Sequence, residues 1–283
     1  MPAPKRIESF EPPWLLPSGA SIAQQGLFRL SQPVLRRCCL SRGFTFFDAT
    51  LLRVCSGRLI LDDNGETTEA SDAASVIVVP KDTRLDVIKS PDSADGIYRS
   101  VFLAFSPQVI GAFHRLHVPA EFASSLAPKP RRMPLDGSFA DTLSYCLRGL
   151  LATDLSDREC EHRLVGVLIA LADRGWQFTR PGLPSVADQL RDVLRNDPSR
   201  SWTTAEAGDV LAMSEATLRR RLAKERLRFE EILMDIRMHH AMALLQTTRW
   251  SIPRVARACG YQTRSRFAAR FRKRFGCSPS EAR

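Results

Sequence analysis

Near its C-terminal end, residues 251–276 of the chain read SIPRVARACGYQTRSRFAARFRKRFG, and this stretch decides the fold of the last hundred residues. Ser251 can cap a helix, and Pro253 follows in the first turn, where a missing N–H costs little. Gly260 permits a sharp turn, because it tolerates backbone angles that larger residues avoid. Thr263 can then cap a second helix. The pattern predicts a short helix, a tight turn and a longer helix.

The same arrangement is predicted a second time upstream. Thr203 or Thr204 can cap one short helix, and Ser214 can cap the helix that follows it. Between the two arrangements, apolar residues recur at intervals of three and four, which predicts one long helix over about 229–246. Residues 185–283 are therefore predicted to form an all-α domain with two helix-turn-helix units joined by a rigid helix.

Most of the excess positive charge lies in the same hundred residues. The chain of 283 residues has a formal net charge of +10, and residues 184–283 hold 20 Lys and Arg against 11 Asp and Glu. Arginine clusters fall on the second helix of each unit, and arginine suits phosphates and guanine edges. Two such helices on one face of DNA should lie about one turn, roughly 34 Å, apart. The pattern favours nucleic acid as the binding partner of these helices over the alternative that they form a solvated basic face.

This region resembles the AraC/XylS family of bacterial transcription regulators over about residues 186–283. The run 251–261 carries the resemblance, together with Phe267, Phe271, Arg272, Lys273, Phe275-Gly276 and Ser278-Pro279. Matches to the first half of the family pattern are Met213-Ser214, Leu218, Arg220, Leu222, Phe229, Arg237, Ala241 and Leu244-Leu245. The resemblance implies a sequence-specific regulator of transcription, an activator, that binds promoter DNA beside RNA polymerase.

The resemblance also assigns roles to individual positions. The family's base-reading positions fall on Ala216, Arg219 and Arg220 in the first unit and on Arg264, Ser265, Ala268 and Ala269 in the second. Because the two alanines offer no hydrogen bonds, base reading in the second unit is expected from Arg264 together with Arg266 or Gln262. Phosphate contacts are expected from Ser214, Lys224, Arg226, Arg228, Thr263, Arg270, Arg272 and Lys273, with Arg274 also at phosphate or in solvent. Arg237 is expected to pair inside the domain. Two departures, Gly208 where Ala is usual and Arg226 where Gly is usual, could loosen the first unit.

The N-terminal half has a different pattern. From about residue 27 to 107, short apolar runs alternate with turn residues, which is typical of a small β-barrel or sandwich. The sequence Asp62-Asp63-Asn64-Gly65 predicts a tight hairpin turn. Over residues 108–176, leucine stripes predict helices whose apolar faces form either the core or a self-association seam.

The resulting fold class is α+β, with a cupin-like β-barrel and C-terminal helices followed by the double helix-turn-helix domain. The expected boundaries are an N-terminal arm over 1–20, a regulatory domain over 21–176 and a linker over 177–184. The family resemblance implies that helices 108–176 dimerise and that the N-terminal domain responds to a small molecule or a regulatory protein.

A ligand pocket in this domain is open to two interpretations. Phe44, Phe46 and Phe102 could line a cavity, or they could fill a barrel too small for a ligand. Arg53 or Arg58 inside the barrel would indicate an acidic or fatty ligand. The alternative to a sensor is a module that binds a partner protein or dimerises.

Several classes of protein are not expected. No catalytic triad, phosphate loop or pair of catalytic carboxylates is recognisable, so the sequence predicts neither an enzyme nor a cofactor. No closed set of metal ligands is apparent, and no apolar run is long enough to span a membrane. The 7 cysteines are expected to be free thiols in the cytoplasm. The competing hypothesis is a non-specific nucleic-acid-binding protein with a structural dimerisation domain.

Overall fold

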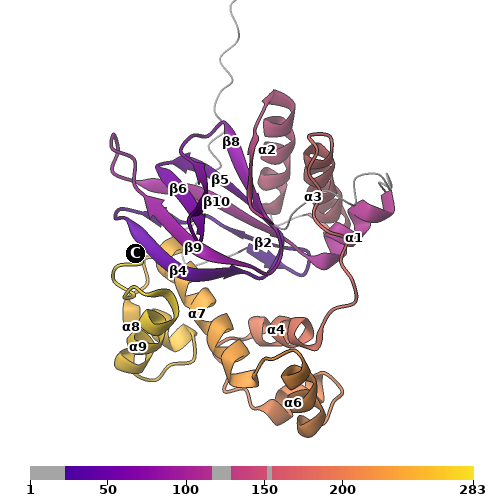
Figure 1. The fold of residues 1–283 in the computed structure, drawn as a ribbon, viewed down its shortest axis with the longest axis vertical. Helices are drawn as coiled ribbons and strands as arrows, with labels where there is room; N and C mark the ends of the chain where they lie inside the picture. Colours follow the sequence, from indigo (N-terminus) through magenta and orange to yellow (C-terminus); the bar gives the residue numbers. More distant parts are fainter. Residues whose placement is uncertain (1–22, 117–128, 152–154) are drawn as a thin grey trace, which may run out of the picture.

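The computed structural model describes residues 23–116, 129–151 and 155–283. The N-terminal arm expected over 1–20 lies outside the described residues. Two antiparallel sheets form the first half of the chain (Figure 1). The larger sheet has the order β1-β2-β10-β5-β8-β11, with β3 also paired to β10, and the smaller sheet has the order β4-β9-β6-β7. The described residues therefore give the predicted mixture of strands and helices, while the closer likeness to a cupin barrel stays a prediction.

The strands follow the short apolar runs of the sequence. They are β1 (Ala23–Gln25), β2 (Phe28–Ser31), β3 (Val34–Leu35), β4 (Cys39–Phe46), β5 (Thr50–Ser56), β6 (Arg58–Asp63), β7 (Glu66–Ala70), β8 (Ser75–Val79), β9 (Thr83–Ser90), β10 (Tyr98–Phe105) and β11 (Arg131–Pro134). Between β6 and β7, Asn64 and Gly65 both have positive φ, at 52° and 99°. The amide of Gly65 donates to Asp62 Oδ1 at 2.7 Å. The predicted two-residue hairpin is confirmed.

Three helices cover one face of the larger sheet (Figure 1). They are α1 (Pro107–Leu116), α2 (Gly137–Leu151) and α3 (Asp157–Ala172). The predicted stripes, including Leu143, Leu147, Leu164 and Leu168, are buried in one apolar cluster with the sheet. The structure therefore supports the interpretation that these stripes form the core of the domain, rather than a self-association seam. The strands β1–β11 with α1–α3 are called the β-domain below.

Six further helices form the C-terminal domain. They are α4 (Val186–Asn196), α5 (Thr204–Val210), α6 (Glu215–Lys224), α7 (Phe229–Thr247), α8 (Ile252–Ala258) and α9 (Arg264–Phe275). Thr203, Ser214 and Thr263 cap their helices by accepting backbone hydrogen bonds, as the sequence predicts. Ser251 occupies the N-cap of α8, but its side chain makes no cap hydrogen bond. Gly276 ends α9 in the left-handed conformation, with φ 77°.

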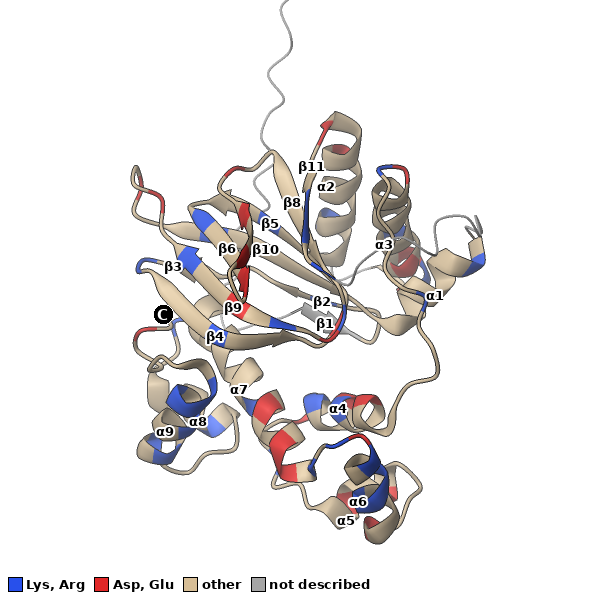
Figure 2. Ribbon diagram, in the orientation of Figure 1, with Lys and Arg blue, Asp and Glu red and all other residues tan. Residues whose placement is uncertain are grey.

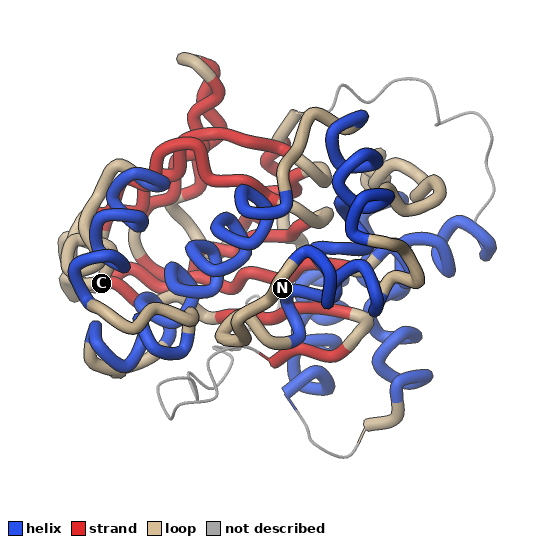
Figure 3. The backbone as a smooth tube through the Cα atoms, turned by 90° about the horizontal axis from the view of Figure 1, so that it is seen from below, coloured by secondary structure: helices blue, strands red, loops and turns tan. Residues whose placement is uncertain are grey.

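The two helix-turn-helix units have separate cores. The first unit, α5 and α6, packs with α4 and the start of α7 around Leu190, Leu218 and Ile232. In the second unit, α8 and α9, the side chains of Phe267, Phe271 and Phe275 are fully buried. These side chains belong to the same apolar cluster as the buried residues between the two sheets. Viewed from below, the C-terminal helices lie across the strands (Figure 3).

Within the described residues, no helix is long and apolar enough to cross a membrane.

Candidate nucleic-acid interface and interdomain cavity

The arginine-rich helices α6 and α9 lie at opposite ends of α7 (Figure 1). The α7 helix has 19 residues, and at about 1.5 Å per residue it is roughly 28 Å long. Its first half packs in the first unit and its second half in the second. A rigid rod of this length separates two helices by a distance close to one turn of DNA.

Most predicted base-reading side chains are exposed to solvent. This holds for Ala216, Arg219, Arg220, Gln262, Arg264, Ser265 and Arg266, whereas Ala268 is half-buried. Arg219 pairs with Glu215 one turn earlier, at 2.6 Å. Because an exposed ion pair of this kind contributes little to stability, Arg219 can exchange Glu215 for a DNA acceptor at low cost.

The predicted phosphate-contacting side chains are exposed as well. They are Ser214, Lys224, Arg226, Arg228, Thr263, Arg270, Arg272 and Lys273. Figure 2 shows the basic residues along α6 and α9. Arg237 donates to the carbonyl oxygens of Pro198 and Arg200, at 3.0 and 2.8 Å, which agrees with the structural role expected for it.

Arg274 corrects the expectation of phosphate or solvent. Its side chain is only 7% exposed and pairs with Asp235, with 2.5 Å between Nε and Oδ1. It also donates to the carbonyl oxygen of Gly43 at 2.7 Å and to Thr45 Oγ1 at 3.0 Å, both in the β-domain. A periodic charge pattern cannot distinguish an arginine facing DNA from one facing another domain.

The two departures from the family pattern have different structural explanations. Gly208 in α5 lies against the turn, where an added Cβ would come 2.6 Å from the carbonyl oxygen of Met213. Gly208 therefore allows close packing, and the expectation that it loosens the first unit is wrong. Arg226 does adopt the left-handed conformation, with φ 58°, in the position where glycine is usual.

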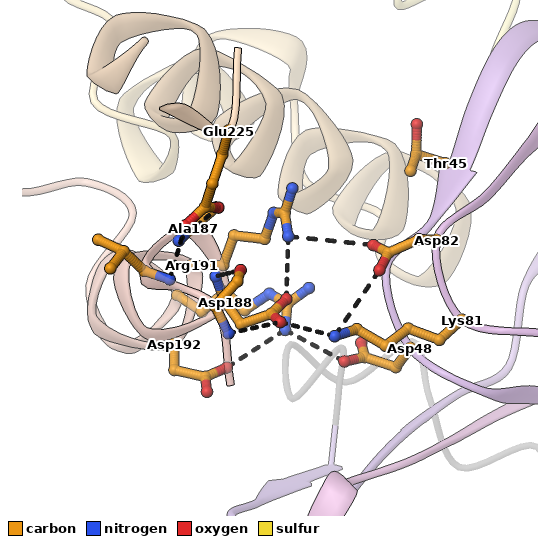
Figure 4. Close-up of polar contacts among 12 residues, drawn as sticks. Thr45, Asp48, Lys81, Asp82, Ala187, Asp188, Arg191, Asp192 and Glu225 are labelled. Atoms are coloured by element: carbon orange, nitrogen blue, oxygen red, sulfur yellow. Dashed lines mark hydrogen bonds and ion pairs between the residues drawn. The ribbon is translucent and has the colours of Figure 1, made fainter. Parts of the chain in front are cut away.

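A set of ion pairs joins α4 to the β-domain (Figure 4). Lys81 Nζ lies 2.8 Å from Asp188 Oδ2, and Arg195 Nη1 lies 3.4 Å from Asp48 Oδ1. The carboxylate of Glu225 accepts from the backbone amides of Val186 and Ala187, at 2.9 and 3.2 Å, and so caps α4. Polar contacts thus join the β-domain to α4, against which the first unit packs.

A cavity of about 140 Å³ lies between the β-domain and α7. Phe44, Phe46 and Phe102 line it from the strands, as the pocket hypothesis expects, and Ile236 and Met242 line it from α7. Figure 1 shows α7 lying beneath the strands. The cavity is therefore lined by strands of both sheets and by α7, at the boundary of the two domains.

The two arginines proposed for the pocket lie elsewhere. Arg53 is buried on β5 and does not line this cavity. Arg58 is exposed and pairs with Glu69 at 2.6 Å. The cavity is instead lined by Arg29, Lys89 and Arg195. Because these residues are distant in sequence, no pattern in the sequence identified them.

The cations at the cavity differ in how they are paired. Arg29 and Arg195 share the carboxylate of Asp48. Burial lowers the pKa of Lys89 to about 8, yet no carboxylate within the described residues pairs with its ammonium group. Lys89 Nζ instead donates to Gln246 Oε1 at 2.7 Å. At neutral pH the cavity therefore presents a half-buried cation that is held by an amide oxygen.

A family model described as a helix-turn-helix domain matches residues 208–283. The C-terminal region is an AraC-type helix-turn-helix domain. Its relatives include the HTH-type transcriptional regulator YdeO of Escherichia coli, which is 37% identical over 98 residues, covering 35% of this chain and 38% of YdeO. The Shigella flexneri virulence regulon transcriptional activator VirF is 32% identical over 42% of this chain and 47% of its own.

The match to one relative extends beyond the AraC-type domain. The transcriptional regulator SirC of Salmonella typhimurium is 37% identical over 168 residues, covering 55% of this chain and 57% of SirC. The chain spans about half the length of the curated relatives that it matches. These relatives are regulators of transcription and not enzymes.

Solved structures of ToxT from Vibrio cholerae share the fold of both domains. One, an apo form of a ToxT variant, has a TM-score of 0.59 at 15% identity, covering 90% of this chain and 96% of ToxT. Another, in complex with (E)-4-(8-methylnaphthalen-1-yl)but-3-enoic acid, has a TM-score of 0.60 at 16% identity, covering 90% and 97%. At this identity the likeness concerns the fold alone.

Proposed function

We propose that this protein is a sequence-specific DNA-binding regulator, acting as an activator, whose α6 and α9 enter adjacent major-groove segments. The observation that carries the proposal is the exposure of both arginine-rich helices at the two ends of one rigid α7. The relatives named as regulators and activators support it. RNA polymerase beside the bound promoter is the partner expected for an activator.

Two substitutions test how α9 contacts DNA. Arg264→Ala should relax preference at one base position, at a cost of about 1–3 kcal/mol for the preferred base, because a bidentate contact to guanine is lost. Lys273→Ala should weaken binding to all sequences alike and reduce the salt slope by about one phosphate, or roughly 0.9 in log affinity per log salt. Both are measured by selection from random duplexes and by fluorescence anisotropy titrations of the full chain.

The alternative function makes the opposite prediction. A non-specific nucleic-acid-binding protein would lose affinity uniformly with either substitution, and selection would return no shared sequence. That result would overturn the proposed base-reading role while leaving the electrostatic contribution intact.

For the signal, we propose that an apolar carboxylate binds in the interdomain cavity, with its charge at Lys89 and its chain against Phe44, Phe102 and Met242. The apolar lining and the ammonium of Lys89, which no described carboxylate pairs, support this class of ligand. ToxT structures have been obtained with an unsaturated fatty acid and with an arylbutenoic acid, which are ligands of the same chemistry.

The small volume of the cavity suggests how such a ligand would act. At about 140 Å³, it is smaller than the roughly 300–1,000 Å³ typical of ligand sites. A long-chain ligand would therefore have to push α7 away from the strands. Because α7 also sets the separation of α6 and α9, occupancy would change how the two helices meet DNA.

The ligand proposal is tested with oleate, and with methyl oleate as an uncharged control. Oleate should raise the Tm of the full chain, and methyl oleate should raise it less. Lys89→Met should abolish the difference, while Lys81→Met, which removes a lysine outside the cavity, should retain it. Equal responses to the two lipids, or an unaltered response in Lys89→Met, would contradict the role of Lys89.

Self-association through the β-domain completes the proposed function. The leucine stripes of α2 and α3 are occupied within the chain, so a dimer would use outer faces such as that around Tyr145, which is 53% exposed. Sedimentation velocity of the full chain at micromolar concentration should show a dimer. A strict monomer would remove this part of the proposal and leave DNA binding by one chain.

A further inference from the structure

A basic cleft of about 770 Å³ lies where the end of α7 meets β3 and the start of β10. Its volume is within the roughly 300–1,000 Å³ typical of ligand sites. The apolar side chains of Val34, Ile97 and Leu245 form part of the lining, together with residues 246–248 and Ser280. No Asp or Glu is among the described residues that line it. We call this site the arginine cleft, because its remaining lining residues are Arg36, Arg37, Arg99, Arg249 and Arg283.

Three of these arginines lack a partner. Arg36, Arg37 and Arg249 are exposed, and no hydrogen bond or ion pair joins them to another described residue. Arg36 and Arg37 follow β3 in the β-domain, whereas Arg249 follows α7 in the C-terminal domain. A cation after the last turn of a helix also interacts favourably with the helix dipole. That effect accounts for Arg249 alone, and not for the two arginines that the β-domain adds.

The other two arginines leave most of the positive charge in place. Arg99 is half-buried and pairs with Asp95, with 2.6 Å between Nη1 and Oδ2. Arg283 donates to the carbonyl oxygen of Trp250, which has no formal charge. Five guanidinium groups thus line the cleft, and a single carboxylate pairs with one of them.

Positive charge in a concave site attracts anions strongly. Such a site focuses the electric field, so an anion is favoured there more than on a flat surface. The planar guanidinium group matches phosphate oxygens through paired hydrogen bonds. A single carboxylate would neutralise only one of these cations, whereas linked phosphates have several charges and many acceptor oxygens. The composition of the cleft therefore favours an anion with more than one phosphate.

The arginine cleft is separate from the arginine-rich helices α6 and α9. None of the described residues that line it belongs to either helix. In Figure 2, β3 and the C-terminal end of the chain lie beside the sheets, whereas α6 and α9 lie below them. A small ligand in the cleft is therefore favoured over a DNA duplex held by those helices.

We propose that the arginine cleft binds a small anion with two or more phosphate groups, and that this anion bridges the β-domain and the end of α7. The convergence of unpaired guanidinium groups from two domains in one cleft carries this inference, which is independent of the apolar ligand and of DNA. Gln246 lines both the arginine cleft and the interdomain cavity, where it accepts from Lys89 Nζ at 2.7 Å. The bound anion would therefore lie near the side chain that holds Lys89.

Calorimetric titration of the full chain with tripolyphosphate tests the proposal. The titration is done at about 0.15 M salt, where attraction between distant exposed charges is largely screened. One tripolyphosphate should bind each chain, and inorganic phosphate should bind more weakly. In the double variant Arg37→Gln with Arg249→Gln, Kd for tripolyphosphate should rise at least about tenfold, because each variant position loses a hydrogen bond between charged groups.

A matched double variant separates the cleft from the surface expected to contact DNA. Arg270→Gln with Arg272→Gln makes the same change in charge on the exposed face of α9, and it should retain the wild-type Kd for tripolyphosphate. All four substituted side chains are exposed, so both double variants should fold. Equal losses in the two double variants, or an unaltered Kd in Arg37→Gln with Arg249→Gln, would overturn the proposal.

Amide hydrogen exchange of the wild-type chain locates the bound anion directly. Tripolyphosphate should slow exchange over residues 34–37 and 246–249, which come from the two sides of the cleft. Slowed exchange confined to α6 and α9 would place the anion on the helices expected to contact DNA. That result would also overturn the proposal.

Discussion

Gly208 shows that a departure from a family pattern can tighten a structure. It lies inside α5, where glycine ordinarily lowers helix stability by about 1 kcal/mol relative to alanine. In this chain the backbone of the turn comes so close that a Cβ has no room beside the Met213 carbonyl oxygen. The amide of Met213 donates to the carbonyl oxygen of Gly208 at 2.8 Å, which holds the two segments together.

Gly208→Ala should therefore destabilise the protein despite the better helix propensity of alanine. We expect a loss of about 1–3 kcal/mol in the free energy of unfolding, because the turn must move to make room. Gly166→Ala in α3 is the control, since its Cβ would meet only Thr142 Cγ2 at 3.9 Å. Urea unfolding should show that Gly166→Ala leaves the free energy of unfolding unchanged or raises it. If Gly208→Ala also raised the free energy of unfolding, the packing argument would be contradicted.

At the scale of the element, α9 has two chemically different faces. Arg264, Arg266 and Arg270 are exposed, while Phe267, Phe271 and Phe275 are buried. Arg274 lies at the end of α9 and extends the buried side with a polar contact to β4. Its partners include the carboxylate of Asp235, the Gly43 carbonyl oxygen and the Thr45 hydroxyl.

Arg274→Ala should cost more stability than any exposed arginine of the same helix. Removing the guanidinium leaves Asp235 and a carbonyl oxygen without this partner. The free energy of unfolding should therefore fall by about 2–3 kcal/mol. Arg272→Ala makes the same change in charge at an exposed position. Its free energy of unfolding should stay within about 0.5 kcal/mol of the wild-type value. Equal unfolding midpoints in urea for the two variants would show that the contact with β4 is unimportant.

The elements were predictable from the sequence to different degrees. The caps at Ser214 and Thr263 and the end of α9 at Gly276 depend on neighbouring residues, so local patterns predicted them correctly. The position of Arg274 depends on β4, which is far earlier in the chain, and sequence periodicity contains no such information. The interdomain cavity combines side chains from β2, β9, α4 and α7 for the same reason, and only its phenylalanines were anticipated.

At the scale of the whole molecule, the domain boundary should respond to pH through His239. The half-buried ring of His239 contacts Phe44, Phe47 and Phe275, between the β-domain and the second unit. Burial first, then the charges of Arg274, Arg195 and Arg29, hold the pKa of His239 well below its ordinary value of 6.5. Folding therefore favours the neutral ring.

The sign of the pH effect follows from proton binding. Below about pH 6.5 the unfolded chain binds a proton at this position that the folded chain does not, so stability is complete above that pH and falls as the pH decreases. The slope contributed by His239 should approach about 1.4 kcal/mol per pH unit. Urea unfolding from about pH 5 to 7.5 measures it. His239→Phe should flatten the profile, whereas replacing the exposed His162 by Gln should leave it unaltered.

The unequal attachment of the two helix-turn-helix units has a consequence for operator architecture. The second unit shares its apolar core with the sheets, whereas the first packs on α4, which is joined to the β-domain by ion pairs such as Lys81 with Asp188. Salt screens such pairs far more than it weakens apolar packing. If α9 and α6 each contact one half of the operator, the position of α9 should be fixed by the β-domain and that of α6 should be adjustable. DNA binding should therefore tolerate the insertion of a single base pair better in the half that α6 contacts than in the half that α9 contacts. This tolerance should increase with ionic strength.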